Sequence, residues 1–221
     1  MTHFVPKLYW ISGSPPAWRV MLAMVLKGID FASHPLDHGA GENRELEYLA
    51  LNPTGQVPTL VRGDLVIRES VAILAWLDRA YPERPIFGRN ADGAARVWQD
   101  VITFENDLRP ASTTVARGLL RGTADAPEWA DAARTLEREI DALAPRLDAS
   151  PFLGGDEPTA SDIWLYPMLG WIARGVDRAD AAAPTVARNL LTGRPWLAAW
   201  HERFAALPGV ADTYPPHWRS T

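Results

Sequence analysis

Cysteine is absent from this chain of 221 residues. Disulfide bonds, thiolate metal ligands, a cysteine nucleophile and C-x-x-C redox chemistry are therefore excluded. The lack of disulfides also fits a cytoplasmic location, because disulfides occur mainly in oxidising compartments. Any thiol chemistry at this protein must use a sulfur atom that a ligand supplies.

Long apolar runs and an excess of positive charge are missing as well. No apolar stretch reaches the roughly 18 residues of a membrane-spanning helix, and the start of the chain lacks the pattern of a signal peptide. The formal net charge is −5, which argues against a general nucleic-acid-binding protein. We therefore expect a cytoplasmic protein with no membrane or nucleic-acid partner and no bound metal.

The first third of the chain alternates strand and helix signals. Short apolar runs predict strands at residues 7–11 and 30–37 and a hairpin turning at Gly63 and Asp64. Helical spacing predicts helices at residues 17–28, 43–51 and 70–81, the first ended by Gly28. The order is β-α-β-α-β-β-α, and the crossover makes the first two strands parallel.

The rest of the chain has only helical patterns. Helices are predicted at residues 95–108, 126–147, 161–175 and 194–208. A Pro- and Gly-rich stretch precedes them and is typical of a linker. We therefore predict an α/β domain at 1–82, a linker at 83–90 and an all-helical domain at 91–221. The Thr159 to Asp162 stretch is typical of a capping box, so Asp162 is assigned to folding.

Two serines lie in a stiff loop at the mouth of the first helix. Ser12 and Ser14 flank Gly13, and Pro15 and Pro16 follow. A serine there can cap the helix. Its hydroxyl can also hold an anion, helped by the unpaired N–H groups and positive dipole end of the helix. Both interpretations hold at this point, and the two roles can coexist.

Three stretches in this order resemble the glutathione transferase family over nearly the whole chain. They are the serine loop, "NPTGQVPTL" (52–60) and "RES" (68–70), with "PFLGGDEPTASDIWLYP" (151–167) downstream. The serine-type classes are most similar, zeta in particular, which includes maleylacetoacetate isomerase. The resemblance implies a thioredoxin-like domain followed by an all-α domain. It also implies glutathione as co-substrate, a cytoplasmic homodimer and a role in detoxification.

The resemblance implies a role for each of these stretches. Ser14 would donate a hydrogen bond to the glutathione thiolate, with Ser12 in reserve. Val57 and a cis Pro58 would pair with the cysteinyl backbone of glutathione, with Gln56 beside them; a plain proline at a strand start is the alternative. The γ-glutamyl end of glutathione would be held by two adjacent residues, Glu69 and Ser70, whose alternative role is capping of the next helix.

The remaining parts of the site are less defined by sequence. Asn43, Arg44 or His38 would hold the glycyl carboxylate. The electrophile pocket would be lined by Phe104, Leu108, Trp164 and Met168. The tail at 214–218 would either cap this pocket or pack on the helices. Arg109 and Arg117 could meet an acidic substrate, although a solvated helix face is the favoured interpretation.

The function expected from these residues is a glutathione-dependent transferase that activates the thiolate for attack on an electrophilic small molecule. Zeta-like isomerisation of a maleyl diacid and dehalogenation are two versions of this chemistry. The alternative is a non-catalytic binding or interaction module with the same fold. Retention of Ser14, Gln56, Val57, Glu69 and Ser70 speaks against that alternative.

Overall fold

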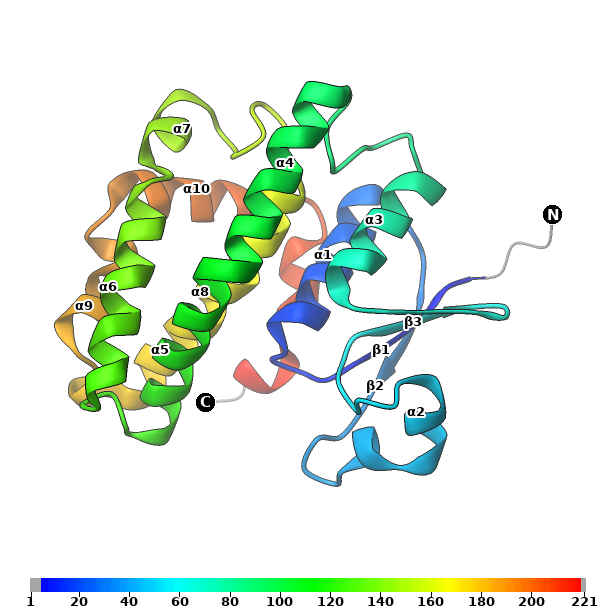
Figure 1. Cartoon of the computed structure of the whole chain (residues 1–221), viewed down its shortest axis with the longest axis horizontal. Helices are drawn as coiled ribbons and strands as arrows, with labels where there is room; N and C mark the ends of the chain where they lie inside the picture. The colour runs from blue at the N-terminus through cyan, green and yellow to red at the C-terminus, as the bar shows by residue number, and fades with distance from the viewer. Residues whose placement is uncertain (1–4, 220–221) are drawn as a thin grey trace. The chain divides into compact units, whose positions relative to one another are not determined.

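Four short strands form one mixed sheet in the N-terminal part of the chain (Figure 1). They are β1 (Lys7–Trp10), β2 (Ala32–Pro35), β3 (Thr59–Arg62) and β4 (Leu65–Arg68), in the order β2-β1-β3-β4 across the sheet. β1 and β2 are parallel, and β3 is antiparallel to both β1 and β4. The predicted parallel pair and hairpin are therefore confirmed. This computed structural model describes residues 5–219.

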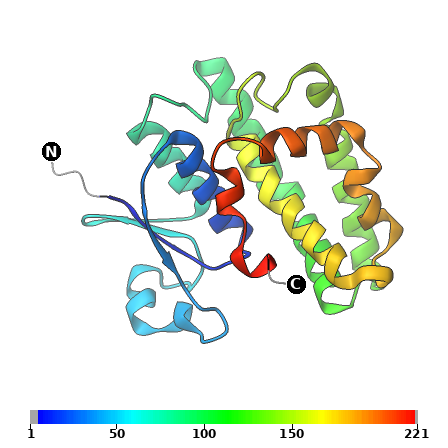
Figure 2. The ribbon, with the colours of Figure 1, turned by 180° about the vertical axis from the view of Figure 1, so that it is seen from behind.

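Three helices accompany the sheet. They are α1 (Pro15–Lys27), α2 (Leu46–Leu51) and α3 (Ser70–Ala80). Helices α1 and α3 pack against each other, and α2 lies on the opposite side of the sheet (Figures 1 and 2). The side chains between sheet and helices are apolar and fully buried, among them Leu8, Leu60 and Ile73. The predicted βαβαββα order is confirmed.

The serine loop ends where α1 begins, two residues earlier than predicted. Pro15 and Pro16 occupy the first helical positions, where a missing N–H costs nothing. Gly28 ends the helix in the left-handed conformation with φ 69°, and its N–H donates to the carbonyls of Met24 and Val25. The serine loop therefore leads directly into the first turn of α1, with Ser14 as the N-cap.

The second part of the chain is helical. Its helices are α4 (Ala91–Thr103), α5 (Arg109–Arg121), α6 (Pro127–Asp141), α7 (Ala144–Ala149), α8 (Ala160–Ala179), α9 (Thr185–Thr192) and α10 (Pro195–Ala205). A π-helical turn, Phe104–Leu108, joins α4 to α5. Helix α8, yellow in Figure 2, is central and contacts α4, α5, α9 and α10. The all-helical prediction for this part is confirmed.

Some helical boundaries differ from the prediction. The helix expected at 126–147 is two helices, α6 and α7, because Pro145 has no N–H to continue the helical ladder. Helices α5 and α9 have no counterpart among the predicted helices. The helix predicted at 161–175 extends from Ala160 to Ala179.

The chain forms two compact units. One comprises Met1–Ile86 with Leu207–Thr221, and the other comprises Phe87–Ala206. The sequence analysis placed the C-terminal segment in the helical domain, whereas here it groups with the sheet. Within the first unit this segment, red in Figure 2, lies beside α1. Two short 3-10 turns, η4 (Val210–Thr213) and η5 (Pro216–Trp218), shape it.

Candidate functional site

Ser14 caps α1 and keeps its own proton available. Its Oγ accepts a long hydrogen bond, 3.4 Å, from the N–H of Ala17, and its N–H donates to the Ile11 carbonyl at 3.1 Å. Among the described residues, no group accepts from the Ser14 hydroxyl. Capping and anion binding are therefore compatible, because the cap uses the oxygen and leaves the hydrogen. A ligand anion would meet that hydrogen and the positive end of α1 together.

Ser12 is differently placed, because it meets the C-terminal segment. Its Oγ lies 2.6 Å from Nδ1 of His217. Gly13 between the two serines has φ 79°, in the left-handed region that favours glycine. The two candidate serines therefore have distinct surroundings: Ser14 faces the helix terminus and Ser12 is engaged by an imidazole.

The peptide bond between Val57 and Pro58 is cis, as predicted. Two side chains stabilise the turn that precedes this bond. The Gln56 carbonyl accepts a hydrogen bond from the Tyr48 hydroxyl at 2.5 Å and another from Asn52 Nδ2 at 2.8 Å. Burial raises the pKa of the Tyr48 phenol, so it remains a donor. Among the described residues, the N–H and the carbonyl of Val57 have no hydrogen-bond partner. The backbone of Val57 is thus open to an added extended peptide.

Glu69 and Ser70 begin α3 in an unusual conformation. Glu69 is the N-cap with φ 64° and ψ 116°, a positive φ that costs a non-glycine residue about 1–3 kcal/mol. Its carboxylate is exposed, whereas Ser70 is buried. Strain of this kind clusters at binding sites.

Arg19 is a residue of this region that the sequence analysis missed. The residue is 1% exposed, and its Nη1 donates to Ser70 Oγ at 3.3 Å. The contact links α1 to the start of α3, so the Ser14 and Ser70 ends of the region are fixed relative to each other. The signal was present in the sequence, because a charged residue interrupts the apolar run from Ala17 to Met24.

The candidates for the glycyl end have different surroundings. Asn43 is buried, and its Nδ2 donates to the Gly55 carbonyl at 2.7 Å, so the amide braces the turn before the cis bond. Arg44 and His38 are exposed. The Arg44 side chain approaches Gly55 closely, since a Cβ there would lie 3.2 Å from its Nη1. Of the three, Arg44 offers a cation next to the turn.

The four residues assigned to the electrophile pocket are all buried in the helical unit. Phe104, Leu108, Trp164 and Met168 are each exposed by 3% or less. Phe104 and Trp164 pack ring to ring at 5.3 Å, and Trp164 Nε1 donates to Glu105 at 2.6 Å. Their helical spacing places them on the inner face of the helical unit, and their role in an electrophile pocket stays a prediction.

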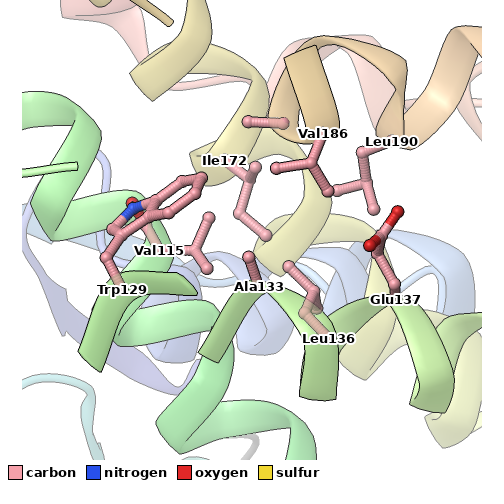
Figure 3. Close-up of a pocket in the computed structure, with 9 residues that line it drawn as sticks. Val115, Trp129, Ala133, Leu136, Glu137, Ile172, Val186 and Leu190 are labelled. Atoms are coloured by element: carbon pink, nitrogen blue, oxygen red, sulfur yellow. The ribbon is translucent and has the colours of Figure 1, made fainter. Parts of the chain in front are cut away.

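A small apolar hollow lies between α5, α6, α8 and α9 in the helical unit (Figure 3). Trp129, Val115 and Ile172 line it, and the Glu137 carboxylate lies at one side. Its volume is about 10 Å³, room for about one water molecule. It is too small to hold a second substrate.

Within residues 5–219 no group of three or more His, Cys, Asp or Glu side chains is placed to hold a metal ion. In the same part of the chain no helix has the length and apolar character needed to cross a membrane.

Comparison with known proteins now identifies the family. The family model of the glutathione S-transferase N-terminal domain matches residues 13–80, and that of the C-terminal domain matches residues 124–203. A glutathione S-transferase from Zea mays is 32% identical over 94% of this chain and 92% of its own. The chain belongs to the glutathione S-transferase family.

Other members of the family resemble the chain to a similar extent. A zeta-class glutathione S-transferase from Euphorbia esula is 30% identical over 95% of this chain and 89% of its own. A maleylacetoacetate isomerase from Pseudomonas aeruginosa is 30% identical over 74% and 79%. The crystal structure of a glutathione S-transferase from the Antarctic clam Laternula elliptica matches with TM-score 0.80 and 28% identity, covering 98% and 95%. The predicted family and the thioredoxin-like plus helical fold are therefore confirmed.

Proposed function

We propose that this glutathione S-transferase family member is a glutathione-dependent transferase in which Ser14 stabilises the thiolate. The observation that carries the proposal is the Ser14 hydroxyl, which caps α1 through its oxygen and retains its hydrogen for a ligand. Family membership supplies the class of ligand. Because the chain has no cysteine, the reacting sulfur is that of glutathione.

Thiolate stabilisation is the chemistry that this corner of the fold supports. A free thiol has a pKa of about 8.5 and is mostly protonated at neutral pH. Each unit of lowering requires about 1.4 kcal/mol of preference for the thiolate. The Ser14 O–H and the N–H groups at the start of α1 both favour the anion. Ser14 is a hydrogen-bond donor in this proposal and forms no covalent intermediate.

The rest of glutathione has matching groups within the same unit. The backbone of Val57, before the cis bond, would pair with the cysteinyl residue like an added strand. The α-carboxylate of the γ-glutamyl residue would meet the Ser70 hydroxyl and the first N–H groups of α3, and its ammonium would meet Glu69. Gln56 is exposed beside this strand, and Arg44 would hold the glycyl carboxylate, with Asn43 bracing the turn.

The reaction is attack of the thiolate on an electrophilic carbon. In a zeta-like isomerisation the sulfur adds to one alkene carbon of a maleyl diacid, which leaves a single bond free to rotate. Elimination then restores the double bond in the trans form and releases the thiolate, so no glutathione is consumed. In dehalogenation the sulfur displaces halide instead. The isomerase version is favoured by the similarity to the maleylacetoacetate isomerase from Pseudomonas aeruginosa.

The proposal also includes a role in detoxification, a cytoplasmic location and a homodimeric assembly.

A substrate panel tests this proposal. The purified chain is retained on glutathione resin and then assayed with glutathione and an aromatic chloride, an alkyl halide, a peroxide or a maleyl diacid. We expect turnover of at least one substrate, together with a thiolate difference spectrum for bound glutathione. Resin binding without turnover or thiolate would overturn catalysis and support a binding module. Failure to bind glutathione would overturn both.

A further inference from the structure

The C-terminal segment reaches the serine loop from 205 residues away in the chain. Nδ1 of His217 lies 2.6 Å from the Ser12 hydroxyl oxygen, a short distance for a hydrogen bond between a nitrogen and an oxygen. The contact joins the loop that carries Ser14 to a segment that was expected from the sequence either to cap the electrophile pocket or to pack on the helices. Both partners belong to the same compact unit.

The segment is anchored by residues before and after His217, so the imidazole is held in place. Trp18 of α1 donates from Nε1 to Thr213 Oγ1 at 2.7 Å, and both residues are buried. Trp18 also packs edge-on against Tyr214 and Trp218, each at 5.7 Å between ring centroids. Trp18 begins the second turn of α1, four residues after Ser14. The same helix therefore positions the loop and the segment.

The loop and the segment also fit sterically. A Cβ on Gly13 would lie 2.9 Å from Cε1 of His217 and 3.2 Å from the indole of Trp218. A Cβ there would force His217 or Trp218 to shift, and the φ of 79° favours glycine as well. The close fit leaves the loop little room to move while the segment is docked.

We propose that His217 is a positioning residue of the glutathione site, which engages the Ser12 hydroxyl and thereby fixes the loop that aims Ser14 at sulfur. The proposal rests on the proposed function of Ser14. It also separates the two serines: Ser12 is the anchor, and Ser14 is the donor to the thiolate. A hydroxyl can donate or accept a hydrogen bond, and a neutral imidazole has one donor and one acceptor nitrogen. Ser12 can therefore donate to Nδ1 of His217, or accept from it, according to the tautomer of the ring.

Four variants test the pair: H217A, H217N, S12A and S12A/H217A. Asparagine keeps a polar atom near the position of Nδ1, so H217N serves as the conservative rescue. R219A is the matched control, because Arg219 donates to the Ala211 carbonyl within the segment and does not take part in the pair. The readouts are the thiolate difference spectrum of bound glutathione against pH and the kinetic constants for glutathione and the active electrophile.

The expected result is a coupled loss. H217A and S12A should each lower the thiolate fraction at neutral pH, and with it kcat, by about three- to tenfold, the range of one net hydrogen bond. KM for glutathione should stay within about twofold, because the groups that would hold the peptide are untouched. The double variant should be no worse than either single variant, and H217N and R219A should resemble the parent.

Additive losses in the double variant, or an H217A protein with the parent's thiolate titration, would overturn the proposal. A loss in R219A equal to that in H217A would also overturn it, since docking of the segment alone would then explain the effect. A measurement without glutathione separates this proposal from the proposed function. The NMR resonance of the His217 ring is assigned by its absence from the spectrum of H217A. In the ligand-free proteins, its pH titration in S12A should differ from that in the parent. An unchanged titration rejects the pair even if the enzyme is active.

Discussion

The carboxylate of Asp162 accepts a hydrogen bond from the indole nitrogen of Trp200, with 2.9 Å between Oδ1 and Nε1. The same carboxylate accepts from the backbone N–H groups of Leu153 and Thr159, each at 2.9 Å, and from the Thr159 hydroxyl at 3.1 Å. Asp162 is fully buried, and burial raises the pKa of its carboxyl against these hydrogen bonds. One side chain thus ties together α10, the loop before α8 and the cap of α8, which confirms its assignment to folding.

Asp162→Ala should lower the free energy of unfolding by about 3 kcal/mol or more, because it leaves several buried donors without an acceptor. Chemical denaturation measures the change. Asp156→Ala is the control, since Asp156 is an exposed carboxylate in the same loop and should change stability by about 0.5 kcal/mol or less. Equal stability of the two variants would contradict the assignment. Glutathione affinity of folded Asp162→Ala should remain that of the parent.

Local patterns in the sequence were sufficient for much of this structure. The run from Thr159 to Asp162 predicted the capping box, and the alternation of strand and helix signals predicted the sheet. The helical spacing of Phe104 and Leu108 identified a real apolar face. Spacing, however, says only that a face is apolar, and burial against α8 depends on tertiary packing. The pairing of Ser12 with His217 could not be predicted, because no local pattern links residues so far apart.

Ser14→Ala should raise the thiol pKa of bound glutathione by about one to two units, the scale of one charge-assisted hydrogen bond. Affinity for the tripeptide should change much less, because the peptide is held elsewhere. Absorbance of the thiolate, titrated against pH, measures the shift. Ser14→Thr keeps the hydroxyl and should retain part of the effect. An unchanged titration curve in Ser14→Ala would remove Ser14 from the proposed mechanism.

Replacing both Glu69 and Ser70 with Ala should weaken glutathione binding by at least about tenfold, since two interactions with charged groups are lost. The thiol pKa of the glutathione that still binds should remain low, because these residues lie at the γ-glutamyl end of the proposed site. Calorimetry measures the affinity. Asp64→Ala, an exposed carboxylate in the β3–β4 turn, is the control.

A second variant at the same position separates binding from stability. Glu69→Gly should relieve the positive φ of 64° and stabilise the fold by about 1 kcal/mol while still weakening glutathione binding. Binding within twofold of the parent in both variants would reject the placement of the γ-glutamyl end.

His201 should make stability depend on pH. Its ring stacks on Tyr166 at 4.8 Å, and burial lowers its pKa, with Glu202 acting weakly in the opposite direction. The unfolded chain therefore takes up the proton first, near a pKa of about 6.5. The free energy of unfolding should fall as the pH drops from that value to the lowered folded pKa, by up to about 1.4 kcal/mol per pH unit. His201→Gln should remove this part of the slope, and an unchanged slope would contradict it.

The proposed homodimer predicts a particular apolar face. On helix α4 the side chain of Trp98 is 37% exposed. Ile102, one turn further along α4, is 51% exposed, so the two lie on one helix face. Burial of this face against a second copy would remove an exposed apolar surface.

Light scattering at micromolar concentration should therefore give about twice the 24.4 kDa mass of the chain. Ile102→Glu should shift the mass toward the monomer, because a carboxylate buried at an interface without a partner is costly. Leu120→Glu makes the same change at a 43% exposed position near the end of α5 and should leave the dimer intact. A parent protein that is monomeric across the micromolar range contradicts the dimer. A dimer that both variants keep instead moves the interface away from this face of α4.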